Sequence, residues 1–376
     1  MMKNIDKNVI YLGWVSFFTD MASNMITTLL PIFIIYVLHE GVDKLGIIIA
    51  ISTFISYAFR ILFGYLSDKY QIVKPFVVSG YFISAVSKPL LAFSTTFTSV
   101  ALLRGVERMG KAVRSASKDS LISSYVKNNS HGKTFGFHKM MDISGELSGA
   151  LIIFLIFMFV SKDEHSIRTI FELTIIPGLI ATFIALFFVK DAPKKEKKDS
   201  SVLNAADYKL LPILIIYFIF VFFIMSDQFF ILKAKTDGYA LSTIPLFVML
   251  LTAIQSLSSY YSGYLSDKIG VIRTLQLAFV FGLLSVSLMD VELWAAFTSL
   301  GLFTIFSLNA VRSYISAYAS SKGFVFGVFY GGVAISTALG ALAIGYIWQL
   351  YGFDRAMLFS EVGMSLMFLI LLLKKA

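Results

Sequence analysis

The six residues GYLSDK occur twice in this chain, at 64–69 and again at 263–268. Each copy follows the second long apolar run of its half. Two further pairs recur in the same order, AVRS at 112–115 and 310–313, and GAL at 149–151 and 340–342. Three ordered matches indicate that a unit of about half the chain has been duplicated, because unrelated halves would not repeat motifs in one order.

Each copy of the duplicated unit contains six apolar runs of membrane length. A membrane-spanning helix needs about 20 mostly apolar residues. Continuous runs predict helices, because lipid offers the backbone no other hydrogen-bonding partner. The runs lie at roughly 8–36, 44–66, 75–95, 98–117, 134–160, 167–189, 210–235, 241–265, 272–290, 293–315, 323–350 and 354–373. We therefore predict an all-α membrane protein with twelve transmembrane helices as two six-helix repeats, 1–189 and 210–376.

The composition excludes several classes of protein. Hydrophobic residues make up 57% of the 376 residues and charged residues only 15%, against about 25% charged in soluble proteins. A soluble enzyme and a disordered protein are therefore excluded. The net charge of +9 lies between apolar runs, which argues against a nucleic-acid binder. The chain has no cysteine and its four histidines are scattered, so we expect no metal site and no cofactor.

The loop charges predict the orientation in the membrane. Lysine and arginine accumulate in cytoplasmic loops. With the N-terminus inside, most loop cations fall on the inner side, and the outer loops hold only Lys44, Lys162, Arg168, Lys235 and Arg355. Both termini are therefore expected in the cytoplasm. The stretch KDAPKKEKKDSSVLNAADYK, residues 190–209, is then a cytoplasmic linker between the two six-helix halves.

The loop motif GYLSDK resembles a motif of the major facilitator superfamily, between the second and third helices of each half. Within that family, four segments resemble a subgroup of prokaryotic efflux permeases: VSFFTDMASNMITTLLPIF, SGYFISAVSKPLLAF, RGVERMGKAVRSASKDSL and FGFHKMMDISG. The resemblance spans essentially the whole chain. It implies a multi-pass protein of the plasma membrane that exports a small molecule, with the substrate held near mid-membrane between the two repeats.

Residues that both repeats share are predicted to serve the conformational change and not substrate binding. Glycine lets helices approach closely, and an aspartate at a helix end can stabilise a neighbouring helix N-terminus or pair with an arginine. Such contacts would hold the cytoplasmic side closed and break when it opens. These gating candidates are Gly64, Asp68, Lys69 and Arg114, with Gly263, Asp267, Lys268 and Arg312.

Residues that only one repeat carries are better candidates for substrate and proton binding. The repeat alignment sets Arg104, Glu107 and Arg108 against Leu302, Ile305 and Phe306. It also sets Asp142 and Glu146 against Val333 and Thr337, Lys88 against Ser287, and Arg60 against Ser259. A charge at the bilayer centre costs about 2.5–3.5 kcal/mol on insertion scales. These side chains should therefore face one another or a water-filled cavity.

The fourth and fifth helices suggest a particular pairing. Consecutive membrane helices run antiparallel, so residues at one depth have numbers with a constant sum. Arg104 with Glu146 and Arg108 with Asp142 satisfy that condition, and residues four apart share one helix face. We therefore expect a two-rung ladder of ion pairs. It could be a proton and substrate site, or a purely structural network.

Asp20 is the carboxylate with the clearest sequence signal for proton uptake. It lies in a polar stretch of the first helix that includes Asn24, and its own helix offers no partner. An unpaired carboxylate in the membrane can take up a proton. Asp227 in the seventh run is its approximate counterpart in the second half. His138 lies one turn before Asp142 and is either part of a relay or a surface residue.

These patterns leave three hypotheses. The first is a monomeric secondary transporter that works by alternating access and exports a small molecule against protons, through Asp20, Glu107, Asp142 and Glu146. The second is a uniporter or symporter that imports an organic anion held by Arg104, Arg108 and Lys88. The third is a membrane enzyme or a lipid scramblase, which lacks support because the chain shows no catalytic constellation.

Overall fold

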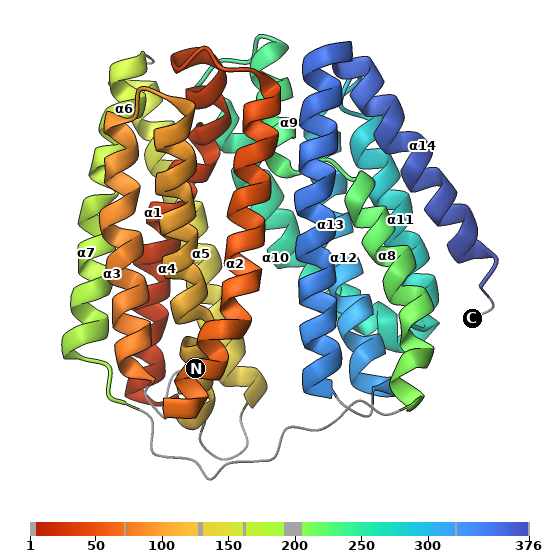
Figure 1. Cartoon of the computed structure of the whole chain (residues 1–376), viewed down its shortest axis with the longest axis horizontal. Coiled ribbons are helices and arrows are strands. Elements are labelled where there is room, and N and C mark those ends of the chain that lie inside the picture. Colours follow the sequence, from red (N-terminus) through yellow and green to blue (C-terminus); the bar gives the residue numbers. More distant parts are fainter. Residues whose placement is uncertain are drawn as a thin grey trace. The chain divides into compact units, whose positions relative to one another are not determined.

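The computed structural model describes residues 5–70, 73–126, 131–160, 163–191, 205–319 and 322–374. Over these ranges the ordered elements are helices and no β-strand occurs (Figure 1). The predicted all-α class is confirmed. Residues 192–204, most of the expected linker, lie outside the described residues.

The first half of the chain forms its helices close to the predicted runs. In order, they are α1 (Lys7–Ile32), its π-helical extension η1 (Phe33–Val37), α2 (Val42–Tyr70), α3 (Lys74–Leu90), η2 (Leu91–Phe93), α4 (Phe97–Ser124), α5 (His131–Phe159), α6 (Glu164–Leu173) and α7 (Ile175–Phe187). The span predicted over 167–189 is found as one membrane-length segment, Glu164–Phe187, in which Thr174 separates α6 from α7. Pro177 cannot donate a backbone hydrogen bond, and its ring clashes with the carbonyl of Leu173, so the helix is interrupted at that point.

The second half follows the same order with one further break. Its helices are η3 (Ala205–Leu210), α8 (Leu211–Phe223), α9 (Asp227–Thr236), α10 (Ile244–Ile269), α11 (Val271–Ser287), α12 (Leu293–Tyr318), α13 (Lys322–Tyr351) and α14 (Phe353–Leu372). The predicted continuous helix over 210–235 is broken at Ile224, which is extended with φ −76° and ψ 137°. Asp227 opens α9, where its negative charge stabilises the helix N-terminus.

Among the described residues, ten helical segments are long and apolar enough to cross a membrane. Two predicted spans lie outside this set. α11 has 17 residues and is short. α4 has 28 residues but is rich in charge, so no stretch of it is sufficiently apolar. The charge of α4 therefore marks it as the unusual helix of the first half.

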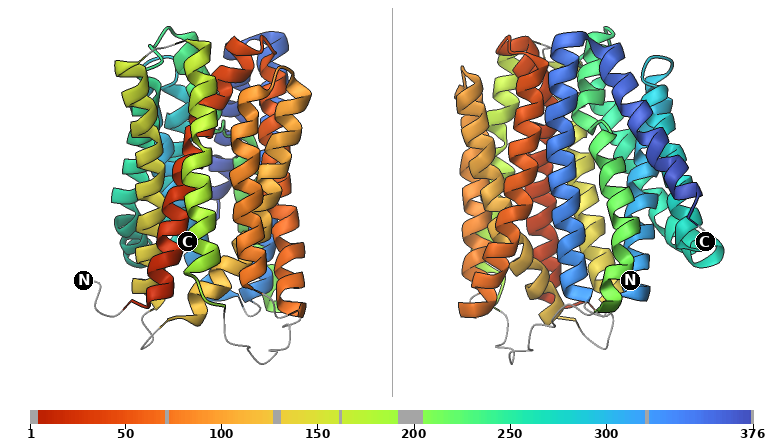
Figure 2. Two further views of the ribbon diagram at one scale, coloured as in Figure 1. Left: turned by 90° about the vertical axis from the view of Figure 1, so that its left-hand side faces the viewer. Right: turned by 45° about the vertical axis from the view of Figure 1, so that its right-hand side comes forward.

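The chain divides into two compact units. The first comprises 1–39, 51–197 and 241–246, and the second comprises 40–50, 198–240 and 247–376. In the first unit, α4 packs against α3, while α5 and α7 pack against α1. The view at the left of Figure 2 shows α1 in red beside α5 in yellow. In the second unit, α11 packs on α12, and α8 packs on α13 and α14.

Two glycines bring α5 close to α1. A Cβ atom at Gly145 would collide with the backbone oxygen of Phe17, and one at Gly149 would lie 2.5 Å from the backbone oxygen of Met21. Small residues at a helix interface allow such close approach in membranes. Glu146, which directly follows Gly145, is therefore held close to α1, the helix that carries Asp20.

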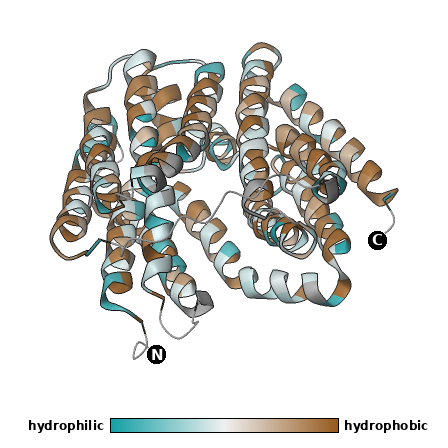
Figure 3. Ribbon diagram, turned by 60° about the horizontal axis from the view of Figure 1, so that its bottom comes forward, coloured by the Kyte–Doolittle hydropathy of each residue, from teal (hydrophilic) through white to brown (hydrophobic). Residues whose placement is uncertain are grey.

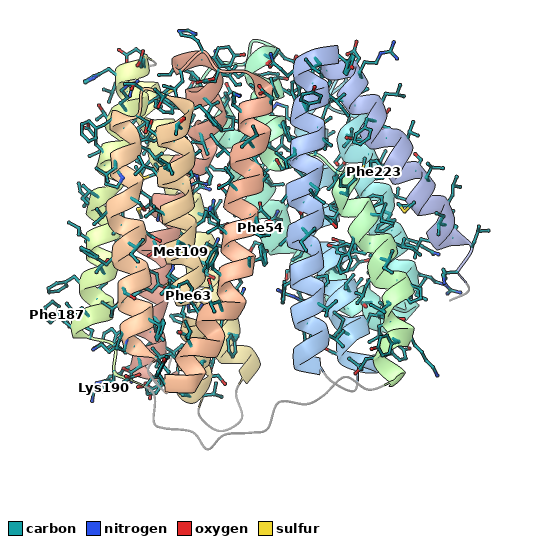
Figure 4. All side chains as sticks on the ribbon, in the orientation of Figure 1. Phe54, Phe63, Met109, Phe187, Lys190 and Phe223 are labelled. Carbon is teal, nitrogen blue, oxygen red and sulfur yellow. The ribbon has the colours of Figure 1, made fainter. Side chains whose placement is uncertain are left out.

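The outward surfaces of the helices are apolar, as a lipid environment requires. Phe187 is 65% exposed and projects from the outer side of α7 (Figure 4). Phe54 on α2 is likewise exposed. Colouring by hydropathy shows hydrophobic residues along most of the helices (Figure 3). Exposed apolar surface on this scale would be unusual for a soluble monomer and is consistent with a membrane-embedded protein.

Candidate functional site

Three charged residues of α4 form a compact ionic cluster. Arg104 Nη1 lies 2.9 Å from Glu107 Oε2, and Arg108 Nε lies 3.2 Å from the same oxygen. The side chains of Arg104 and Glu107 are 0% exposed. One hydrogen bond joins the backbone of this cluster to α3: Ser84 Oγ donates to the backbone oxygen of Glu107 at 3.2 Å. One carboxylate is thus shared by two guanidinium groups inside the first unit.

This cluster replaces the expected ladder between α4 and α5. In the part of the chain that the structure describes, Arg104 and Arg108 form ion pairs with Glu107 and not with Glu146 or Asp142. The prediction was wrong because it assumed that consecutive helices are packed neighbours. α4 instead packs on α3, and α5 on α1, so equal depth does not bring the four side chains together.

Lys88 and Arg114 connect α3 with its neighbours. Lys88 is fully buried, and its Nζ donates to the backbone oxygen of Thr19 at 3.1 Å. Arg114 Nη1 donates to Ser84 Oγ at 2.7 Å, and its guanidinium carbon lies 4.6 Å from the centre of the Tyr81 ring. A buried cation that donates to a backbone carbonyl is a structural tie, which fits Lys88 better than contact with a substrate.

A polar cavity of about 160 Å³ lies inside the first unit, between α1, α3, α4 and α5. Its cations are Lys111, Arg114, Lys118 and Lys139. Its carboxylates are Asp20, Asp142 and Glu146. Hydroxyl groups of Ser16, Thr19, Tyr81 and Ser115 complete the lining. Three of the predicted site residues thus meet here, together with four cations, two of them lysines of α4, that the sequence analysis did not single out as binding residues.

Asp20 and Glu146 are the uncommitted acids of this cavity. Among the described residues, neither forms an ion pair or a hydrogen bond with another side chain. Both lie in the middle of their helices, α1 and α5, and the close α1–α5 packing brings them to one cavity. Both carboxylates are therefore available to a ligand of the cavity.

His138 is part of this site and is not a surface residue. It is buried, with 5% exposure, and its Nε2 lies 2.9 Å from Ser16 Oγ. Its Nδ1 lies 3.4 Å from Asp142 Oδ1, and Lys118 Nζ lies 3.5 Å from Ser16 Oγ. The surface alternative was therefore wrong. Its spacing of four residues from Asp142 was the signal for a shared helix face.

The remaining predicted site residues lie outside the cavity. Asn24 is buried and accepts a hydrogen bond from Thr28 at 3.1 Å. Arg60 Nη2 lies 2.9 Å from Asp119 Oδ2 in a solvent-exposed ion pair. Asp227 is exposed at the start of α9, in the second unit. The structure therefore does not bring these three residues together with Asp20 and Glu146.

The predicted gating contacts are only partly described. The side chains of Gly64, Asp68, Lys69 and Asp267 lie outside the described residues. Lys268 Nζ lies 6.0 Å from the centre of the Tyr264 ring. Arg312 donates to the hydroxyl of Tyr330 through Nε and Nη2, at 3.1 and 2.8 Å. Gly263 has open space around its Cα. The described partners of both shared arginines, Arg114 and Arg312, thus include tyrosines.

In the part of the chain that the structure describes, no three His, Asp or Glu side chains are grouped closely enough to hold a metal ion. The chemistry available to the cavity is therefore that of ammonium, guanidinium, carboxylate, imidazole and hydroxyl groups. Such a set can bind charged groups and exchange protons.

Comparisons with known proteins agree with this architecture. The family model of the Major Facilitator Superfamily matches residues 12–341. An uncharacterized MFS-type transporter, MJ1317 of Methanocaldococcus jannaschii, is 30% identical over 367 residues, covering 93% of this chain and 90% of its own.

Two solved structures share the fold at low sequence identity. A mutant of the nucleoside transporter NupG superposes with a TM-score of 0.82 at 13% identity, over 97% of this chain and 99% of that one. A bacterial homologue of the human lysosomal transporter Spinster, in an inward-facing and occupied conformation, gives 0.71 at 13% identity, over 96% and 92%.

Proposed function

Because the chain belongs to the major facilitator superfamily, we propose that it exports a small molecule in exchange for protons by alternating access. As a member of this family it is a multi-pass transporter of the plasma membrane with a small-molecule substrate, and not an enzyme. The proposal adds that the protein works as a monomer with twelve spans and both termini in the cytoplasm. α4 and α11 are then the two spans beyond the ten apolar ones.

The observation that carries proton coupling is the pair Asp20 and Glu146. Both line the polar cavity without an ion-pair partner among the described residues. In a membrane protein, ionisable groups that face a cavity mark ion and proton pathways by default. Asp142, which also lines the cavity and contacts His138, extends the set of groups over which a proton can be passed. Glu107 is held by two arginines and is assigned a structural role.

Electrostatics favours exchange over cotransport when proton and substrate use the same carboxylates. A substrate cation bound beside Asp20 and Glu146 stabilises their ionised forms and so expels protons. A proton bound there removes the charge that holds the cation. The two ligands therefore compete, and each drives release of the other. Competition at one site is sufficient to couple outward movement of the substrate to inward movement of protons.

Opening and closing of the cytoplasmic side is assigned to the elements shared by both repeats. Asp68 and Asp267, at the inner ends of α2 and α10, are proposed to change their contacts between the open and closed states. Arg114 and Arg312 are their candidate partners. Discrete rearrangements of such helix-end contacts are a common switching device.

The structure argues against the three residues that the anion-import hypothesis assigned to anion binding. Lys88, Arg104 and Arg108 do not line the cavity of the first unit, and each is engaged by a backbone oxygen or by Glu107. An anion bound in the cavity would have to use Lys111, Arg114, Lys118 or Lys139. It would also favour proton uptake by the neighbouring carboxylates, which predicts cotransport instead of exchange.

The test uses inside-out membrane vesicles with an acidic interior and a pH-sensitive dye. Cationic, zwitterionic, neutral and anionic compounds are added in turn. We expect at least one compound to release protons from wild-type vesicles. We expect vesicles with Asp20→Asn or Glu146→Gln to show less than about a tenth of that release, because the competing carboxylate is gone. Glu172→Gln, on the exposed face of α6, is the matched control. Compound uptake without proton release in the wild type would overturn the proposal.

A further inference from the structure

We propose that the substrate is a small zwitterion, of the size of an amino acid, whose ammonium group is bound by Asp20 and Glu146 and whose acid group is bound by Lys111 and Lys139. This inference rests on the proposed function and adds the substrate class. It follows from the charges, the size and the polarity of the cavity in the first unit.

The first step is the balance of uncommitted charge. Lys111 of α4 and Lys139 of α5 line the cavity, and among the described residues neither ammonium group forms an ion pair or a hydrogen bond. Asp20 and Glu146 also line the cavity, and their carboxylates likewise form no ion pair or hydrogen bond among the described residues. Arg114 and Lys118 also line the cavity as cations and contact neutral serines, Ser84 and Ser16, while Asp142 contacts His138. The cavity therefore presents four cations and three carboxylates, so groups of both signs are available to a ligand.

The second step is the cost of a ligand with a single charge. An ammonium ligand that reached the two carboxylates would also lie beside the two lysines, which repel it because like charges a few ångströms apart destabilise each other. A carboxylate ligand would meet the same penalty from Asp20 and Glu146. Like-charge juxtaposition is an effective means of rejecting a wrong partner. A ligand with one group of each sign satisfies both sets at once.

The third step is size and polarity. The cavity volume of about 160 Å³ is well below the roughly 300–1,000 Å³ of pockets for drug-sized ligands. Its lining consists of charged and hydroxyl side chains, which offers little to a large apolar compound. The occupant is therefore small and hydrophilic.

A zwitterion also explains how one site serves both ligands. The ammonium group competes with protons for Asp20 and Glu146, while the acid group is recognised by lysines that take no part in that competition. Recognition and coupling are thereby assigned to different side chains. Removing a lysine should weaken recognition and leave exchange intact, and removing a carboxylate should abolish exchange.

The test measures the melting temperature of the purified protein in detergent with each of the twenty amino acids, β-alanine and γ-aminobutyrate. Each compound is compared with its methyl ester, which keeps only the positive charge, and its N-acetyl derivative, which keeps only the negative one. We expect at least one zwitterion to raise the melting temperature by about 2 °C or more. Both of its derivatives should bind at least about tenfold more weakly.

Variants assign the two ends of the ligand. Lys111→Gln should remove the preference for the zwitterion over its methyl ester, and Glu146→Gln the preference over its N-acetyl derivative. If Lys111→Gln fails to fold, Lys139→Gln tests the same end of the ligand. If Glu146→Gln fails to fold, Asp20→Asn takes its place. Lys209→Gln, outside this cavity in the second unit, is the matched control and should keep both preferences.

The substrate class and the proton coupling can fail separately. No stabilisation by any zwitterion, or equal binding of a derivative with one charge, would overturn the inference on the substrate while proton release in vesicles could still be found. Binding of a zwitterion without proton release would retain the substrate class and overturn the coupling.

Discussion

The two repeats fill equivalent positions of one helix with different chemistry. In the first repeat, α4 carries the ionic cluster of Arg104, Glu107 and Arg108. At the positions aligned with them, α12 carries Leu302, Ile305 and Phe306, and Phe306 is buried with its ring 5.5 Å from that of Phe281. The duplicated backbone therefore accepts either an ionic or an aromatic interior, so the charges are not needed to form the helix packing itself.

The helix interfaces, by contrast, are alike in the two repeats. Gly149 of α5 lies against the backbone oxygen of Met21, and Gly340 of α13 lies against the backbone oxygen of Phe222. These glycines belong to the repeated GAL motif. The comparison separates two kinds of residue. Those that set the packing recur in both repeats, whereas the lysines and carboxylates that line the polar cavity occur in the first repeat; Arg114, matched by Arg312, is the charged lining residue that both share.

The largest effect on stability is expected from Glu107→Leu. It leaves the buried Arg104 and the partly buried Arg108 without their carboxylate partner, which should cost about 3–5 kcal/mol of unfolding free energy. Thermal unfolding in detergent measures the loss. Copying the second repeat with Arg104→Leu, Glu107→Ile and Arg108→Phe together should recover at least half of the stability. A single variant as stable as the wild type would contradict the ionic cluster.

The glycine contacts should give the next largest effect. Gly149→Val forces α5 away from the Met21 carbonyl and should cost about 1–3 kcal/mol, because overpacking displaces the backbone. Gly340→Val, against Phe222 at the equivalent position of the second repeat, should cost a similar amount. Gly136→Ala, on α5 with open space around it, is the control and should be neutral or slightly stabilising. Unequal losses at 149 and 340 would contradict the structural likeness of the repeats.

His138→Phe should have a smaller effect on stability. It removes the contacts with Ser16 and Asp142 and leaves polar atoms buried without partners, at about 1–2 kcal/mol. His138→Gln, which keeps a hydrogen-bonding side chain, should lose less than half as much. Differential scanning fluorimetry of the two variants compares them, and equal losses would show that the hydrogen bonds are unimportant.

The smallest effect is expected at the exposed pair of Arg60 and Asp119. Arg60→Gln should change the unfolding free energy by less than about 1 kcal/mol, because water screens a surface ion pair. Ser259→Ala at the equivalent position of the second repeat should also be nearly neutral. A loss above about 2 kcal/mol at Arg60 would show that the pair is more buried than its exposure indicates.

The sequence was sufficient for the class of fold and for the asymmetry between the halves. Apolar runs, loop charges and the repeated GYLSDK motif report on the membrane and on duplication directly. The meeting of Asp20, Asp142 and Glu146 could not be derived, because it depends on which helices are neighbours. α5 packs on α1 and not on α4, and chain order does not encode that choice. Lys111 was overlooked as a binding residue because the predicted span ended at 117, which assigned its charge to the cytoplasmic end, whereas α4 continues to Ser124 and places Lys111 in its middle.

The most direct test of the account compares Asp20→Asn with Asp227→Asn, the approximately equivalent acids of the two repeats. Each variant is reconstituted in proteoliposomes, and proton movement is recorded when the compound that releases protons in the vesicle assay is added. We predict that Asp20→Asn loses at least about nine-tenths of the proton movement and that Asp227→Asn keeps more than half. Equal losses would contradict the claim that the first repeat alone carries the coupling.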